Sequence, residues 1–225
     1  MTTTINAKNI TLGEVSQFLK FQEQLNNDTY TNFLSLEPLT EIEQLELAQI
    51  RNDFREYLSV ERVSEGLVQA LTTFPLMRLA GFYRRPIKMS LEQDIANITI
   101  EDEDTTITGR FDILAINKEK QIAPDIPFWI LVIESKNSLI APRAGLLQLL
   151  TYASKSLEYQ ESVWGLATSG EFYQFVNIRR GNPPTYQLMP FLTLMEPEPS
   201  ILLLQVLKAI AEGRRKKEEG RRKKQ

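Results

Sequence analysis

The chain has 225 residues, of which 42% are apolar and 24% charged, with a net charge of −3 and neither cysteine nor histidine. This composition is ordinary for a globular protein of one domain with extensions, and it excludes disulfides, thiol nucleophiles, histidine general bases and the usual zinc sites. Any bound metal must therefore be a hard cation held by oxygen, such as Mg²⁺, Mn²⁺ or Ca²⁺.

The charge is unevenly distributed along the chain. The last twelve residues, RRKKEEGRRKKQ (214–225), carry a net charge of about +6, which leaves about −9 on the first 213 residues. We expect 214–225 to be a disordered basic tail on an acidic body, which is not the usual charge distribution of a protein that coats nucleic acid. The sequence has no signal peptide and no apolar stretch of about 20 residues, so we expect a cytoplasmic protein without a membrane partner.

The N-terminal part of the chain is predicted to be helical. Residues 1–40 are expected to form a peripheral helical segment, with Thr11 and Glu14 as a capping box. A second capping box, Thr40 with Glu43, predicts the start of one helix or two nearly continuous helices that run from about 41 to 73. Pro75 is expected to lie just after the last helix ends.

Residues 41–196 are expected to form the core domain, and residues 197–213 a C-terminal helix. In the strand predicted over 105–117 we expect Phe111, Ile113 and Ala115 on one face and Arg110, Asp112 and Leu114 on the other. The patterns after residue 80 predict, in chain order, strands at 81–91, 95–102, 105–117 and 127–138, a helix at 141–158, a hairpin that turns at Ser169-Gly170, a short strand near 185–194 and a helix at 200–212. This order indicates an α/β or α+β fold, with a central mixed β-sheet flanked by helices.

The strand PFWILVIESKNS (127–138) joins an apolar run directly to Glu134 and Lys136. These residues lie two apart, so both side chains leave the strand on the same face. Taken alone, they would be read as an ion pair at the rim of a sheet. If the preceding strand is a neighbour, however, Asp112 joins them, and two carboxylates with a carbonyl and waters can bind Mg²⁺ while the lysine holds a water or a phosphate.

The order Asp112, then 21 residues, then Glu134-Ser-Lys136 resembles the pattern of the PD-(D/E)xK nuclease superfamily. More narrowly, the segments GRFDILAIN, WILVIESKNS, GLLQLLTYA and WGLATSGEFYQF resemble the N-terminal nuclease domain of type I restriction enzyme R subunits. The resemblance covers roughly residues 60–195. It implies a restriction-endonuclease-like core with Asp112 and Glu134 as ligands of Mg²⁺ or Mn²⁺ and Lys136 as a catalytic residue.

The resemblance also implies further site residues. Many family members have another acidic residue in the helix before the first core strand, for which Glu65 is favoured here over Glu61. Gln148 and Tyr152 match the Gln-x-x-x-Tyr motif of RecB-like members, although their spacing also fits the polar edge of an amphipathic helix. Thr168-Ser-Gly170 stands where R subunits have a Thr-Asn-Gly hairpin.

Three features depart from the family pattern or compete with it. Phe111 precedes Asp112 where the motif name has proline. Asp125 lies nine residues before Glu134 and follows a proline, as the motif name requires. It lies in a proline-flanked loop, however, and is rejected as the site aspartate. The sequence has no G-x-x-x-x-G-K-[ST] phosphate loop, so the chain has no motor for translocating DNA.

We therefore expect a metal-dependent DNA endonuclease in which Asp112, Glu134 and Glu65 bind the metal and Lys136, Gln148 and Tyr152 complete the active site. The alternative is an inactive nuclease-fold module that binds nucleic acid or a protein. The expected partner is DNA; a separate motor or modification subunit and a second copy of the chain, as a homodimer, are further partners that this reading allows. Arg84-Arg85 and Arg179-Arg180 are either solvated surface or phosphate contacts.

Overall fold

The computed structural model of the chain describes residues 3–26, 28–94, 98–100, 105–123 and 126–213. It contains the strands β1 Thr3–Asn6, β2 Gln22–Glu23, β3 Ile87–Asp94, β4 Ile98–Ile100, β5 Thr105–Thr108, β6 Arg110–Ala123, β7 Ile126–Ser135, β8 Ser162–Thr168, β9 Phe172–Arg179, β10 Thr185–Leu188 and β11 Leu192–Thr193. The helical elements are η1 Ala7–Asn9, α1 Leu12–Leu19, α2 Tyr30–Phe33, α3 Glu41–Val60, α4 Glu65–Val68, the π-helix η2 Gln69–Thr73, α5 Phe74–Leu79, the 3₁₀-helix η4 Pro142–Gly145, α6 Leu146–Leu157 and α7 Pro197–Ala211.

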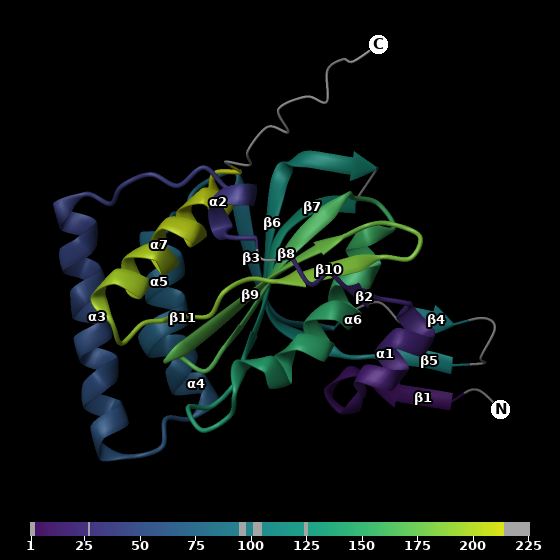
Figure 1. The fold of residues 1–225 in the computed structure, drawn as a ribbon, viewed down its shortest axis with the longest axis horizontal. Coiled ribbons are helices and arrows are strands. Elements are labelled where there is room, and N and C mark those ends of the chain that lie inside the picture. Colours follow the sequence, from purple (N-terminus) through teal and green to yellow (C-terminus); the bar gives the residue numbers. More distant parts are fainter. Residues whose placement is uncertain (1–2, 27, 95–97, 101–104, 124–125, 214–225) are drawn as a thin grey trace, which may run out of the picture.

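An eight-stranded mixed sheet forms the centre of the molecule (Figure 1). Its strand order is β2-β10-β9-β8-β7-β6-β3, and β11 pairs with β9. β7 and β8 are parallel and are joined through η4 and α6. The pairs β3–β6, β6–β7 and β8–β9 are antiparallel. The predicted mixed α/β fold, with a central mixed sheet flanked by helices, is therefore confirmed.

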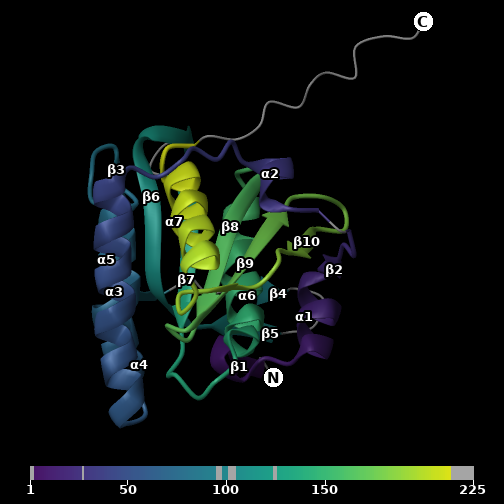
Figure 2. The same cartoon turned by 60° about the vertical axis from the view of Figure 1, so that its left-hand side comes forward.

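Helices cover both faces of the sheet (Figure 2). One core lies between the sheet and α3, α4, α5 and α7, and it includes Ile113, Ile133 and Leu166 from the central strands. The other core lies on the α6 side and includes Leu114 and Val132. Side chains that alternate along β6 and β7 thus enter different cores, which explains why both strands read as nearly continuous apolar runs.

Phe111 is an exception to the alternation expected for β6. Its ring packs edge to face against Trp129 and Tyr152, with ring centroids 6.2 and 6.4 Å apart. It therefore belongs to the core on the α6 side together with Leu114, whereas Ile113 and Ala115 belong to the opposite core. The prediction that Phe111 shares a face with Ile113 and Ala115 was wrong.

The first 40 residues contain more than the expected helices. The capping boxes at Thr11 and Thr40 are both present. β1, however, pairs with β5 in a separate three-stranded sheet, and β2 pairs with β10 at the edge of the main sheet. The segment is therefore built into both sheets.

The helical region predicted over 41–73 is two separate stretches. α3 ends at Val60, and a new helical stretch begins at Glu65 and continues through the π-helix η2 into α5. Pro75 lies in the first turn of α5, directly after the π-helix η2, and not beyond the end of the helix as predicted. None of the helices in the described ranges has the length and apolar character needed to cross a membrane.

Candidate functional site

Glu134 is buried at the end of β7, with only 1% of its side chain exposed. It follows the apolar residues Val132 and Ile133, and its neighbour on β8 is Ala167. A Cβ on Gly145, the residue before α6, would lie 2.9 Å from Glu134 Cγ, so this carboxylate is packed directly against the start of the helix. The positive end of the α6 dipole therefore lies next to a buried negative charge.

Lys136 provides the only hydrogen bond to the Glu134 side chain within the described residues. Its Nζ donates to Glu134 Oε1 over 2.7 Å, while Glu134 Oε2 is buried without a hydrogen-bond partner. Burial, and then the negative charge of Asp112, raises the pKa of Glu134 to about 7 even though Lys136 opposes the shift. One lysine is therefore insufficient to stabilise this carboxylate, and the unpaired Oε2 is available to another cation.

Asp112 lies beside Glu134 on the neighbouring strand. β6 and β7 pair with Ile113 opposite Ile133, and continuing this register places Asp112 opposite Glu134. Asp112 Oδ2 accepts a 2.7 Å hydrogen bond from the backbone N–H of Ser135. The convergence of Asp112, Glu134 and Lys136 that was inferred from their spacing is thus present in the fold.

Glu65 also lies near this cluster. Its negative charge contributes to the raised pKa of Glu134. It is the first residue of α4, and the segment before it is tied to the loop that follows β7. Ser138 N–H donates to the carbonyl of Val63 over 3.1 Å, and Val63 N–H donates to Ser138 Oγ over 3.0 Å. Glu61, the other candidate, is exposed where α3 ends.

Gln148 and Tyr152 are buried on α6 and do not form the exposed edge of an amphipathic helix. Gln148 Nε2 donates to the Tyr152 hydroxyl over 3.2 Å, and that hydroxyl donates to the carbonyl of Arg110 over 2.9 Å. A Cβ on Gly109 would lie 2.9 Å from the Tyr152 ring. Tyr152 thus anchors the start of β6, two residues before Asp112, and burial together with the charge of Glu134 raises its pKa.

The predicted hairpin turn at Ser169-Gly170 connects β8 and β9 and supports the end of β7. Lys136 N–H donates to the carbonyl of Thr168 over 2.7 Å, and Thr168 Oγ1 accepts from the N–H of Gly170. Gly170 has a positive φ of 85°, and a Cβ there would lie 2.5 Å from the Phe54 ring. Only glycine fits a turn that is packed this closely under α3.

Sequence reasoning missed Gly145 and three buried hydroxyl groups. Ser135 Oγ, Thr73 Oγ1 and the Tyr173 hydroxyl are buried without hydrogen bonds of normal geometry. Ser135 pairs with Thr168, and Thr168 with Tyr173, so the hydroxyl residues of the strands lie in one row across β7, β8 and β9. Continuing the strand alternation one step past Ile133 would have predicted that Ser135 faces the core on the α3 side.

Two observations bear on whether this cluster suits a metal ion. No group of three or more Asp or Glu side chains in the described ranges lies close enough together to form a metal site. Mg²⁺, however, is commonly held by one or two carboxylates and several waters. The buried, unpaired Glu134 Oε2 next to Asp112 supplies that donor set, so the residues present fit a hard divalent cation. Asp125, the rejected candidate, lies outside the described residues.

Comparison of the chain with models of known protein families, and with the sequences of curated proteins, found no match.

Proposed function

We propose that the chain is a metal-dependent DNA endonuclease of the PD-(D/E)xK type. The observation that carries the proposal is the buried Glu134, which has one oxygen bound by Lys136, the other without a partner, and Asp112 on the neighbouring strand. Burying a carboxylate in this way is unfavourable unless a cation compensates it. The order Asp112, Glu134, Lys136 and the helix that carries Gln148 and Tyr152 agree with the resemblance to restriction endonucleases.

Asp112 and Glu134 would hold Mg²⁺ or Mn²⁺, with Glu65 close enough to assist through its charge or a bound water. The ion would lower the pKa of a bound water and neutralise charge on the phosphate. Lys136 would exchange its contact with Glu134 for the attacking water or the scissile phosphate. With 14% of its side chain exposed, Lys136 can make that exchange from the solvent side, whereas Glu134 cannot leave its buried position.

Gln148 and Tyr152 support the site by positioning other residues. Both donate hydrogen bonds within the protein, and the Tyr152 hydroxyl is occupied by the carbonyl of Arg110.

The direct test is cleavage of supercoiled and linear DNA in the presence of Mg²⁺ or Mn²⁺. Wild type should cleave both substrates, and Asp112→Asn and Glu134→Gln should each reduce the rate by at least about 100-fold. Glu43→Gln, an acidic residue far from the cluster, is the matched control and should cleave like wild type. Equal cleavage by all four proteins would identify a contaminating nuclease and reject the proposal.

A second candidate function is a nuclease-fold module that binds nucleic acid or a protein and has lost catalysis. It is favoured by the Lys136–Glu134 ion pair, which already compensates part of the buried charge, and by the acidic body of the chain. Calorimetry with and without EDTA separates the two functions. A binding module should retain its affinity for DNA without divalent metal and should not cleave when metal is added. Co-purification with an ATPase would support a separate motor subunit.

A further inference from the structure

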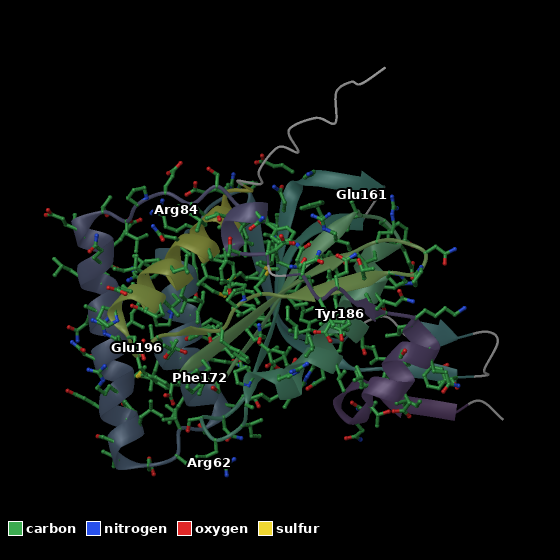
Figure 3. The ribbon with its side chains drawn as sticks, viewed as in Figure 1. Arg62, Arg84, Glu161, Phe172, Tyr186 and Glu196 are labelled. Carbon is green, nitrogen blue, oxygen red and sulfur yellow. The ribbon has the colours of Figure 1, made fainter. Side chains whose placement is uncertain are left out.

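A cavity of about 460 Å³ lies at the opposite end of the sheet from Glu134. Its walls include Phe128 and Ile130 near the start of β7, whereas Glu134 lies at the end of that strand. Figure 3 shows Arg84, on the wall of the cavity, and Arg62, in the segment between α3 and α4, at opposite ends of the molecule. The volume is in the range of about 300–1,000 Å³ that is typical of small-molecule sites. The cavity is therefore separate from the proposed active site.

The inner part of the cavity is apolar and aromatic. Leu34, Ile130 and Trp164 line it and are buried in the core on the α3 side. Phe128 and Pro86 add two further rings to the lining. Such walls suit a flat apolar group, because aromatic and apolar side chains stack on planar rings.

The rim of the cavity is positively charged. Arg84, Arg85 and Lys120 line it and are exposed, and Arg84 and Arg85 form no ion pair within the described parts of the chain. Lys208, a fourth basic residue on the wall, is paired with Glu43. The remaining acidic residue on the wall is Glu212, so positive charge exceeds negative charge.

Hydrogen bonds fix the main chain that carries these cations. Ile87 N–H donates to the carbonyl of Arg84, and Lys118 N–H donates to that of Pro86, each over 3.0 Å. The Asn117 side chain accepts from the backbone N–H of Lys120 over 3.0 Å. Lys120 Nζ lies 4.0 Å from the centre of the Phe128 ring, so one cation already contacts an aromatic wall. An anion bound here would meet cations whose main chain is ordered beforehand.

We propose that this cavity binds a nucleoside monophosphate, with the base in the part lined by Trp164 and Phe128 and the phosphate on Arg84 and Arg85. Arginine side chains bind phosphate oxygens in bidentate geometry, and the half-buried ring of Phe128 offers the base a surface to stack on. The proposed binding needs no divalent metal and none of the carboxylates near Glu134, so it does not depend on the proposed nuclease activity.

Tryptophan fluorescence can report on this site directly. The chain has two tryptophans, and Trp129 lies on the other side of the sheet, in contact with Phe111. In a Trp129→Phe variant, Trp164 is the sole tryptophan. Titration with adenosine monophosphate in EDTA should give a saturable change in its emission. Arg84→Ala and Arg85→Ala should each weaken binding by about tenfold or more, and Arg62→Ala, at the other end of the molecule, is the charge-matched control that should not.

Calorimetry on the wild-type chain provides the same readout if Trp129→Phe does not fold. Adenosine and inorganic phosphate, tested separately, should each bind more weakly than adenosine monophosphate. The absence of both saturable fluorescence change and binding heat would overturn the proposal. An equal loss of affinity in Arg62→Ala and Arg84→Ala would also overturn it, because it would reveal unspecific attraction to positive charge. If phosphate alone bound as tightly as the nucleotide, the nucleoside part of the proposal would be wrong.

Discussion

In two Glu–Lys ion pairs of this molecule, the pKa of the glutamate is shifted in opposite directions. Glu43 and Lys208 join the start of α3 to the end of α7, with 19% and 16% of their side chains exposed. Glu43 also accepts hydrogen bonds from Thr40. Burial alone would raise the pKa of Glu43, but Lys208 and Thr40 together lower it below its ordinary value. Glu134 and Lys136 have similar chemistry, but the pKa of Glu134 is raised to about 7.

The difference lies in the surroundings of the carboxylates. Every contact described for Glu43 stabilises its negative charge, which is what a structural ion pair requires. Glu134 is more deeply buried, has one oxygen without a partner and faces the charges of Asp112 and Glu65. A pair that leaves its carboxylate uncompensated contributes little to stability, and we therefore interpret it as a cation site in which the lysine is one of two cations.

The largest expected effect comes from removing the two lysines in turn. Lys136→Met should lower the rate of Mg²⁺-dependent DNA cleavage by at least about 100-fold, because a positioned proton donor or phosphate ligand contributes at least that much. Lys208→Met should leave the rate within about twofold. Initial rates on supercoiled DNA measure both. Similar rates for the two variants would remove the functional distinction between the pairs.

The dependence of stability on pH should have opposite sign for the two glutamates. The pKa of Glu134 is about 7 in the folded chain against an ordinary value of 4.5, so the free energy of unfolding should fall as pH rises from about 4.5 to 7. Glu134→Gln should remove this slope and, in EDTA at pH 8, stabilise the protein by up to about 3 kcal/mol.

Glu43 has a lowered pKa, so its contribution to stability should be present above pH 4.5 and be lost only at lower pH. Glu43→Gln should therefore destabilise the protein at pH 8, by at most about 1 kcal/mol. Urea denaturation at pH 5 and pH 8 measures both variants. If Glu134→Gln were no more stable than wild type at pH 8, the buried carboxylate would not be the unfavourable group described above.

The packing of Gly145 against Glu134 offers a test that keeps both charges. In Gly145→Ala the new Cβ would lie 2.9 Å from Glu134 Cγ, and we expect a loss of stability of about 1–3 kcal/mol together with weaker Mn²⁺ binding. Gly66→Ala is the matched control, since nothing lies within 4 Å of its Cβ, and it should be neutral or slightly stabilising. Equal Mn²⁺ affinity in the two variants, measured by calorimetry, would argue against Glu134 as a ligand.

The smallest expected effect is that of the Tyr152 hydroxyl. Tyr152→Phe leaves the Arg110 carbonyl and the Gln148 amide without this partner, which should lower stability by about 1 kcal/mol. Tyr159→Phe, at an exposed position, should have no measurable effect. Urea denaturation compares the two. A neutral Tyr152→Phe variant would mean that the hydroxyl does not anchor β6.

The sequence predicted the centre of the fold well because long patterns define it. The apolar run before Glu134, the helix over Leu146–Leu157 and the Ser169-Gly170 hairpin each combine a repeated spacing with a clear end. The same patterns placed Asp112 beside Glu134, because neighbouring antiparallel strands bring their side chains together in register.

The remainder depends on contacts between distant parts of the chain. β1 and β2 have four and two residues, too few for a period, and their partners lie about 100 and 160 residues away in the sequence. Glu65 approaches the site through the hydrogen bonds between Val63 and Ser138, which no local pattern encodes. Phe111 and Pro75 were misplaced because ring packing and a π-helix override the local rule.

The measurement that most directly tests the central claim is anomalous diffraction from a crystal of the chain soaked in Mn²⁺. We expect one anomalous peak in contact with the carboxylates of Asp112 and Glu134, at the Glu134 oxygen that now has no partner. Absence of a peak at that position, at a Mn²⁺ concentration that gives peaks elsewhere on the molecule, would contradict the claim that these carboxylates form a metal site.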